Sequence, residues 1–362
     1  MTNNNDKKVL NVPPSTDKGN AIRNVPPLRF PEFSGEWKEE QLDSIATLSK
    51  GVGISKEQLS EVGEPCILYG ELYTKYKSEI IKQIESKTDI DCSKLKRSKA
   101  NDVIIPCSGE TAVDIATARC VPFDNILFGG DLNVISLHKY DGAFMSYQLN
   151  GKRKYDIARV AQGVSVVHLY GDHLKAIKTY NPTLPEQQKI AKLLSLLDER
   201  IATQNKIIEK YESLIKGIAQ NITCSNKPNV HISECLECSS STLQESDVFE
   251  HGAYPVYGAN GIVGYLDNYN TENEAVYIIK DGSGVGTVSY VTGKCSATGT
   301  LNILQAPNGY SLRYLYYLLK VFNFEPYKTG MAIPHIYFKD YGKAKIFCPL
   351  YSEPNMQHCC QQ

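Results

Sequence analysis

The sequence predicts an α+β protein made of two related domains that are separated by one long coiled-coil helix. Three observations support this. The chain has 362 residues, enough for two domains at roughly 150 residues each. A segment of the first half recurs in the second half, and a heptad pattern lies between the two copies. The hydrophobic fraction of 42% and the charged fraction of 22% are typical of a soluble globular protein.

The first 27 residues, MTNNNDKKVLNVPPSTDKGNAIRNVPP, are predicted to form a disordered leader. They contain basic residues but no apolar core and no small-residue cleavage site, so they do not have the pattern of a secretion signal. No window approaches the about 18 consecutive apolar residues that a membrane-spanning helix requires. We therefore expect a cytoplasmic protein without a membrane partner.

The eleven cysteines are odd in number and irregularly spaced, which favours reduced thiols over a disulfide framework. Cys224, His231, Cys235 and Cys238 form one tempting group of soft ligands. This group contains a single CxxC pair and lacks a complete zinc-finger spacing, so no metal site is predicted.

An internal repeat defines the two domains. Residues 162–187, QGVSVVHLYGDHLKAIKTYNPTLPEQ, align without a gap to residues 329–354, TGMAIPHIYFKDYGKAKIFCPLYSEP. The identical pairs share one offset (335 − 168 = 167) and are Gly163/Gly330, His168/His335, Tyr170/Tyr337, Lys178/Lys345, Pro182/Pro349 and Glu186/Glu353. Six identities in register indicate a duplicated unit.

The similarity continues upstream of these segments. NDVIIPCSGETA, from Asn101, parallels EAVYIIKDGSGVGTV, from Glu274, and DLNVISL, from Asp131, parallels GTLNILQ, from Gly299. An aromatic amphipathic segment follows in each half, at Ala143 and at Leu312. Each half is thus predicted to run strand, glycine turn, strand, short helix and a final strand pair, with the first domain at 28–182 and the second at 228–350.

The glycine run Gly282–Gly286 resembles a phosphate-binding loop only at first sight. Such a loop needs a helix directly after its glycines, whereas this run is followed by the β-branched and aromatic segment TVSYV. It also lacks the lysine and hydroxyl residue of a Walker loop. The run is predicted to be a hairpin, and nucleotide binding is disfavoured.

Residues 183–220 are predicted to form the helix between the repeats. Thr183 and Glu186 fit a capping box at its start, and Gly217 suits an end near Lys216. Residues at alternating steps of four and three form a coiled-coil seam, with only Gln204 polar: Ile190, Leu194, Leu197, Ile201, Gln204, Ile208, Tyr211 and Ile215. A rod of some thirty residues is roughly 45 Å long, so a spacer or assembly helix is favoured over a core helix.

Two related α+β domains around a helix that opens LPEQQKIAKLLSLLDERI resemble the specificity (S) subunit of type I DNA restriction-modification systems. LRFPEFSGEWKEEQLDSIA, from Leu28, is similar to the usual start of a recognition domain in that family. The resemblance covers Leu28 to about Glu353. It implies that each domain is a target-recognition domain reading one half of a bipartite double-stranded DNA sequence. It also implies spacer helices that dock methyltransferase (M) subunits and, through them, restriction (R) subunits.

The end of the chain departs from the family pattern. The second copy closes on CPLYSEPNMQHCCQQ, and no heptad helix follows it. Residues 351–362 are therefore expected to be a truncated tail without the second spacer helix. A natural truncation, a frameshifted or recombined gene, and an arrangement in which a second S chain supplies the partner helix all remain open.

Candidate DNA contacts follow from the resemblance and from clustered charge, because lysine and arginine fix phosphates while polar side chains read base edges. The net charge is −1, so contacts must come from local patches. The first domain offers Lys96, Arg97, Lys99, Lys152, Arg153 and Lys154. In the second domain, Lys280, Ser283 and Lys294 flank the glycine hairpin.

Catalytic motifs are missing from the sequence, so a noncatalytic subunit without a cofactor is predicted. The nearest approach to an adenine-methyltransferase motif is Asn181-Pro182-Thr183-Leu184, at the entry to the helix. His168 and His335 lie in apolar strand contexts and are interpreted as structural. The alternative is a truncated or phase-variable, defective or regulatory interaction protein that binds partner helices without reading DNA. A stand-alone nuclease is disfavoured by the missing motifs.

Overall fold

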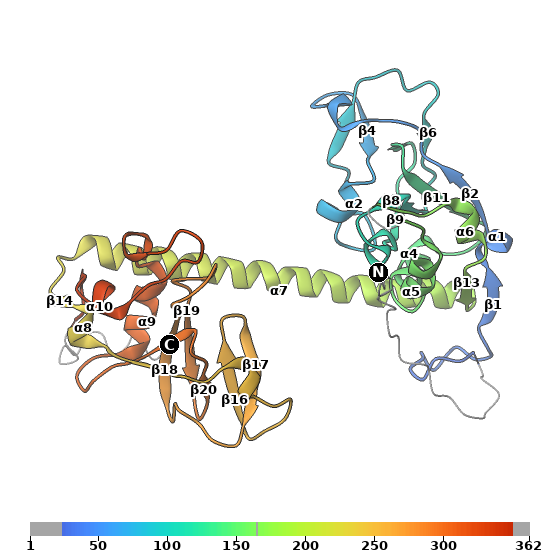
Figure 1. Ribbon diagram of the computed structural model, residues 1–362. Coiled ribbons are helices and arrows are strands. Elements are labelled where there is room, and N and C mark those ends of the chain that lie inside the picture. Colours follow the sequence, from blue (N-terminus) through green and yellow to red (C-terminus); the bar gives the residue numbers. More distant parts are fainter. Residues whose placement is uncertain (1–23, 164–165, 350–362) are drawn as a thin grey trace, which may run out of the picture. The chain divides into compact units, whose positions relative to one another are not determined.

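The computed structural model describes residues 24–163 and 166–349. Most of the predicted leader, and the whole predicted tail at 351–362, lie outside these residues. The chain divides into a first unit, Met1–Ala202, and a second unit, Thr203–Gln362. Helix α7 (Leu184–Ser225) passes through the division as one unbroken element (Figure 1). Within the described ranges, every helix is too short or too polar to span a membrane.

The first unit contains a four-stranded sheet, a five-stranded sheet and two two-stranded sheets, β1-β13 and β12-β8, together with short helices. Its strands are β1 (Lys38–Gln41), β2 (Ala46–Lys50), β3 (Leu59–Ser60), β4 (Glu64–Ile67), β5 (Ser86–Thr88), β6 (Lys96–Arg97), β7 (Asp102–Pro106), β8 (Ser108–Gly109), β9 (Arg119–Val121), β10 (Leu127–Phe128), β11 (Leu132–Leu137), β12 (Val167–His168) and β13 (Lys178–Asn181). Its helices before α7 are α1 (Leu42–Ile45), α2 (Glu71–Thr74), α3 (Ala112–Ile115), α4 (Gly142–Asn150), α5 (Lys154–Val160) and α6 (Gly171–Lys175).

The second unit repeats this composition on a smaller scale. Its strands are β14 (Val230–His231), β15 (Glu237–Ser240), β16 (Tyr254–Gly258), β17 (Gly261–Leu266), β18 (Glu274–Ile279), β19 (Val288–Thr292), β20 (Ser296–Ala297), β21 (Leu301–Gln305) and β22 (Lys345–Ile346). Its helices are α8 (Ile232–Cys235), α9 (Leu312–Val321) and α10 (Phe338–Tyr341).

The central sheets of the two units have the same topology, which confirms the repeat. The order is β2-β11-β7-β9 in the first unit and β15-β21-β18-β19 in the second, with antiparallel pairing throughout. The middle strands β7 and β18 are buried almost along their whole length. Continuous apolar runs such as DVIIP and AVYII are typical of strands that are buried on both faces.

The helix that covers each central sheet is capped in the same way. The Asp141 carboxylate accepts a hydrogen bond from the amide of Phe144 at the start of α4 (2.7 Å), and the Ser311 hydroxyl accepts one from Tyr314 at the start of α9 (3.3 Å). Such caps satisfy amides that have no partner in the first turn of a helix. The amphipathic segments identified at Ala143 and Leu312 are thus confirmed as helices.

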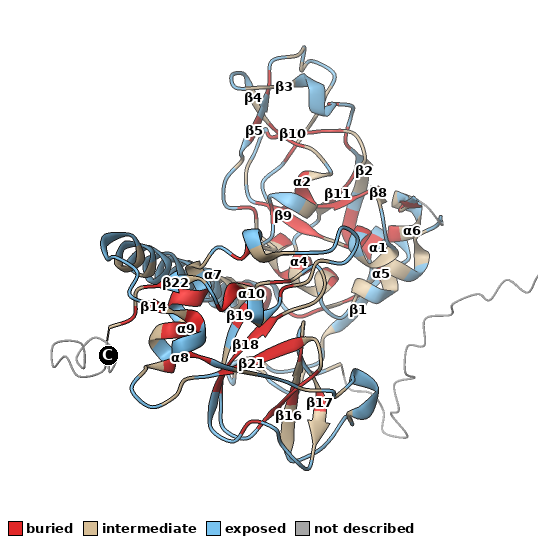
Figure 2. Cartoon of the chain, turned by 60° about the vertical axis from the view of Figure 1, so that its left-hand side comes forward, coloured by how far each residue is buried: buried red, intermediate tan, exposed pale blue. Residues whose placement is uncertain are grey.

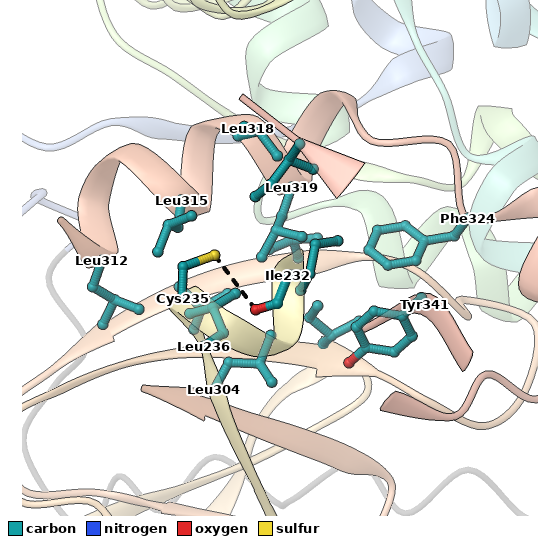
Figure 3. Close-up of a cluster of buried hydrophobic side chains, with 14 of the residues drawn as sticks. Ile232, Cys235, Leu236, Leu304, Leu312, Leu315, Leu318, Leu319, Phe324 and Tyr341 are labelled. Atoms are coloured by element: carbon teal, nitrogen blue, oxygen red, sulfur yellow. Dashed lines mark hydrogen bonds between the residues drawn. The ribbon is translucent and has the colours of Figure 1, made fainter. Parts of the chain in front are cut away.

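The core of the second unit shows how α9 is held. Leu312, Leu315, Leu318 and Leu319 of α9 lie over Leu304 and the short helix α8. Figure 3 shows their side chains pointing toward Ile232, Cys235 and Leu236, with the Cys235 thiol donating to the Ile232 carbonyl (3.4 Å). Burial raises the pKa of the Cys235 thiol to about 12, so this thiol is a packing group.

The predicted glycine hairpin is also confirmed. β18 and β19 pair antiparallel, with Ile278 opposite Val288, and the chain between them turns through Gly282 and Gly286. Both glycines have positive φ angles, +97° and +90°. Left-handed backbone of this kind is accessible to glycine without the Cβ penalty of other residues, so the glycines serve the turn.

Helix α7 is longer than the heptad pattern predicts. It spans 42 residues, about 63 Å at 1.5 Å per residue, and it ends at Ser225 rather than near Lys216. Gly217 lies inside the helix with open space where its Cβ would be, and it does not adopt a left-handed backbone. A single glycine costs an exposed helix only about 1 kcal/mol, and the helical turns that follow continue past it.

The first turns of α7 are anchored to the first unit through Glu186, which is fully buried. Its two carboxylate oxygens accept hydrogen bonds from Nε and an Nη of Arg29 (2.7 and 2.6 Å), and Trp37 Nε1 donates to it at 3.3 Å. The predicted capping box with Thr183 is therefore wrong, because Glu186 is committed to the segment 28–37 instead. The hydrogen bond between Arg29 and Glu186 raises the pKa of Arg29.

Neighbouring residues complete the anchor. The Gln187 amide oxygen accepts from the backbone of Asp141 at the start of α4 (2.9 Å), and its nitrogen donates to the Pro182 carbonyl (2.8 Å). Three turns later, Tyr147 donates to Asp198 (2.5 Å), and Lys82 pairs with Glu199 (3.0 Å). The helix is thus fastened to the first unit from Glu186 to Glu199.

We expect Glu186→Gln to lower the thermal midpoint of the full-length chain by several degrees, about 5 °C, because it leaves the Arg29 guanidinium without its counter-charge. Differential scanning calorimetry measures this. Glu32→Gln is the matched control, since Glu32 pairs with Lys189 at an exposed position of the same junction and should change the midpoint little. Equal effects of the two changes would contradict a special role for Glu186.

Candidate partner and nucleic-acid interfaces

The predicted seam of α7 is exposed over most of its length. Ile190 and Leu194, in the anchored turns, are half-buried, whereas the remaining positions of the seam are exposed to solvent. Figure 2 shows these later turns of α7 as exposed. The exposed seam residues are Leu197, Ile201, Gln204, Ile208, Tyr211 and Ile215. An apolar stripe of this kind, left uncovered by the described parts of the chain, is typical of a protein interaction surface.

Further apolar side chains widen the seam on one side. Leu193, Ile207 and Leu214 each precede a seam residue by one position, and all three are exposed. In heptad terms they occupy g positions next to the a positions Leu194, Ile208 and Ile215. A face of three apolar positions per heptad is broader than a two-stranded coiled-coil seam requires, and it suits packing against more than one helix.

Two of the candidate DNA-binding arginines are engaged within the first unit. Arg97, on β6, forms a two-pronged ion pair with Glu64 (2.5 and 2.9 Å), which raises the pKa of Arg97 and lowers that of Glu64. Arg153 pairs with Asp156 (3.1 Å), stacks over the Tyr180 ring and is only 14% exposed. Their charges are already balanced inside the chain.

The four candidate lysines of this unit differ from the arginines. Lys96 and Lys99 lie at or beside strand β6, at the edge of the five-stranded sheet β3-β5-β4-β10-β6, and Lys152 and Lys154 lie at the start of α5. All four are exposed or half-buried, and none forms an ion pair with another described residue. They remain available to an anionic partner, but on two different elements.

The candidates of the second unit also separate into two places. Lys280 and Ser283 lie in the turn between β18 and β19, and this turn contacts the segment 329–336 through a hydrogen bond from the Gly282 amide to the Pro334 carbonyl (3.0 Å). Lys294 lies after β19, with its ammonium over the rings of Tyr269 and Tyr254 (4.6 and 5.9 Å). A hydrogen bond with Tyr269 raises the pKa of Lys294.

The two repeated histidines make equivalent contacts. His168 Nδ1 lies 3.3 Å from the Ser108 hydroxyl, and His335 Nδ1 lies 2.7 Å from the Asp281 carboxylate. Ser108 and Asp281 occupy the same place in the repeat, directly after the central strands β7 and β18. Both histidines are half-buried and orient the loops on which they lie, in keeping with their interpretation as structural.

A cavity of about 720 Å³ in the first unit is lined in part by Ser108, the residue that contacts His168. Tyr69 and Tyr73 line it together with the carboxylates of Glu110 and Asp114. Among the described residues of its lining the cation is Arg119, which is buried and donates to the carbonyls of Tyr76 and Ala118 (2.6 and 2.9 Å). Burial lowers the pKa of Arg119. An acidic lining of this kind does not favour a phosphate group.

Arg29 and Trp37 are important residues that the sequence analysis did not identify. Their partner Glu186 is 157 and 149 positions away, so no local pattern indicates the contact. A signal was nevertheless present. The segment 28–37 and the helix start 184–189 are both sequence motifs, and two motifs that close the same domain are candidates for mutual contact.

Comparison with known proteins assigns most of the chain to one family. The family model for the type I restriction modification DNA specificity domain matches residues 34–213 and 230–359. A putative type I restriction enzyme specificity subunit of Haemophilus influenzae is 33% identical over 82 residues, which are 22% of this chain and 21% of that protein. A putative type I specificity subunit of Mycoplasma genitalium is 23% identical over 277 residues, 70% of this chain and 66% of that protein. The chain thus spans less than two thirds of the length of either relative.

A solved structure has the same fold. The crystal structure of the S subunit of a type I restriction-modification system from M. genitalium aligns with a TM-score of 0.63 at 19% identity. The alignment covers 87% of this chain and 85% of that chain. The fold predicted from the sequence, two α+β domains and a long helix, is confirmed.

We expect Ile208→Asp to leave the thermal midpoint of the isolated chain within about 2 °C of the wild type, because Ile208 is 54% exposed and packs against no core. Ala191→Asp, on the same helix but 4% exposed, should lower it strongly through a buried, unpaired charge. Thermal scans of both variants measure this. Strong destabilisation by Ile208→Asp would show that the seam is covered within the chain.

Proposed function

The chain belongs to the type I restriction modification DNA specificity family, and we propose that it is the noncatalytic subunit that recognises DNA and docks the methyltransferase. The two units would be target-recognition domains that each contact one half of a bipartite duplex site. The seam of α7 would bind the methyltransferase subunits, and the restriction subunits would join through them. The observation that carries the proposal is the combination of a duplicated fold with a long helix whose apolar seam is exposed.

The docking role rests on the exposed part of the seam, from Leu197 to Ile215. A helix in water gains most of its stability from packing of an apolar face, so a stripe exposed over about five turns calls for a partner helix. The broad a, d and g face supports binding of helices from methyltransferase subunits. A helix from a second S chain is a further candidate occupant of the same face.

The DNA-binding role rests on cations that form no ion pair with a described carboxylate. In the first unit these are Lys96, Lys99, Lys152 and Lys154, and in the second unit Lys280 and Lys294, with Ser283 beside Lys280. Arg97 and Arg153 would contribute less than sequence clustering alone indicates, because Glu64 and Asp156 already bind them. Phosphate contacts by the lysines would position each unit on the duplex.

A second candidate function is partner binding without DNA recognition. The exposed seam supports both functions equally, because it can bind a partner helix whether or not the two units bind DNA. The two functions differ in one observable. Only the DNA-recognition subunit gives a complex whose duplex binding depends on base sequence and weakens with salt.

We expect Ile208→Asp to abolish co-purification of the methyltransferase subunit encoded with this chain, because a charge in the seam would be desolvated at the interface. Affinity purification after co-expression measures the ratio of the two subunits. Ser213→Asp is the matched control, since residue 213 lies on the opposite face of the same stretch of α7. Retention of the methyltransferase by Ile208→Asp would contradict docking at the seam.

We expect the double change Lys152→Glu and Lys154→Glu to weaken duplex binding by the co-purified complex. The plot of the logarithm of the association constant against the logarithm of the salt concentration should become less steep by about two. Fluorescence anisotropy between 50 and 200 mM salt gives both quantities. Lys56→Glu with Lys77→Glu makes the same change of charge at exposed positions outside the proposed contacts. Equal slopes for the two double variants would reject the assignment.

A further inference from the structure

Both units contain a short loop that is closed by the same pair of backbone hydrogen bonds. In the second unit the tip hairpin, Thr329–His335, is closed by two backbone hydrogen bonds between its end residues (2.8 and 2.7 Å). In the first unit Gln162 and His168 exchange the equivalent pair (2.9 and 2.6 Å). The structure describes every residue of the tip hairpin of the second unit.

A glycine at the base makes each loop narrow. Gly330 has a φ of +89°, and a Cβ there would lie 2.3 Å from the Ile333 carbonyl oxygen. Gly163 has a φ of +124°, and its Cβ would lie 2.1 Å from the Val166 carbonyl oxygen. Only glycine fits such a position, so each loop requires a glycine at its base.

The tip hairpin presents apolar side chains to solvent. Met331 is fully exposed, and Ile333 is 57% exposed. Val166, at the place of Ile333 in the first copy, is exposed as well. Single exposed apolar residues are ordinary, but their recurrence at one place of a duplicated turn indicates a common ligand.

The base of the tip hairpin is rigidly supported. The Gly282 amide donates to the Pro334 carbonyl (3.0 Å), and the Ile336 amide donates to the Lys280 carbonyl (2.9 Å). The contact between His335 and Asp281 fixes the side chain at the end of the turn. A narrow tip on a fixed base has the form of a wedge.

The charges around the tip hairpin indicate which ligand it meets. The Asp281 carboxylate lies 2.7 Å from His335 Nδ1, and Glu325 is paired with Lys328 (2.6 Å). Lys280 and Lys339 form no ion pair with another described residue, and the Lys339 ammonium lies over the ring of Tyr337 (5.2 Å). An apolar tip beside two lysines without ion pairs suits a ligand that is negatively charged outside and apolar inside. A DNA duplex is such a ligand, because its phosphates surround a stack of bases.

We propose that the tip hairpin of the second unit enters the DNA duplex and places Met331 and Ile333 against a base step as an apolar wedge. This rests on the proposed function, since it assumes that the second unit contacts DNA. Methionine and isoleucine are among the side chains that such wedges use, and unstacking one step costs a few kcal/mol that contacts elsewhere must offset. A protein partner is the less favoured occupant, because a stable protein interface needs about 800 Å² on each side and the tip offers two side chains.

The test uses the complex of this chain with its methyltransferase subunit and a duplex that carries the methylated motif, identified by methylation mapping. 2-Aminopurine is placed in turn at each step of the two half-sites. We expect its fluorescence to rise at one step on binding of the wild-type complex. Met331→Ser with Ile333→Ser should remove most of this rise and weaken binding about tenfold or more.

Ile262→Ser is the matched control, because Ile262 is 53% exposed on β17 of the same unit and lies outside the tip hairpin. It should retain both the fluorescence rise and the affinity. Unchanged fluorescence and affinity in the tip variant would overturn the wedge. Loss of the methyltransferase subunit from the tip variant would also overturn it and identify the hairpin as a protein-docking element. A wild-type complex without sequence-selective binding would overturn the proposed function itself, and the wedge with it.

Discussion

The pairing of Glu186 with Arg29 is the constraint on which the attachment of the long helix depends. A carboxylate that is fully buried needs a compensating charge and full hydrogen bonding, and the guanidinium supplies both through two parallel hydrogen bonds. Because Arg29 belongs to the start of the domain and Glu186 to its end, the pair closes the first unit. Trp37 and Gln187 add contacts at the same point. These contacts fasten the first turn of α7 to the first unit.

An exposed seam is the consequence of this anchoring. Contacts of α7 with the first unit extend to Asp198 and Glu199, after which its apolar side chains face solvent. Exposure of this apolar stripe to water is unfavourable, and large exposed apolar surfaces promote association. The heptad spacing suits the partner helix that we propose, because such a helix would bury the stripe.

The two units share a scaffold and differ at its margins. Both have the same central sheet order, the same capped helix and the same hairpin next to the central strand. They differ in the second sheet, which has five strands in the first unit and three in the second, and in the residue that contacts the repeated histidine. A constant frame with variable loops and edges is the arrangement that reading two different half-sites would require.

The sequence by itself determined the features that depend on neighbours along the chain. Periodicity located the helix and its seam, a constant offset revealed the repeat, and the residues after Gly286 identified a hairpin. Tertiary structure decided the features that depend on distant partners. It assigned Glu186 to Arg29 instead of a capping box, and it engaged the charges of Arg97 and Arg153 inside the first unit. The reason is physical: hydrogen bonds and ion pairs act over a few ångströms in space, and residues up to 157 positions apart meet there only after the chain has folded.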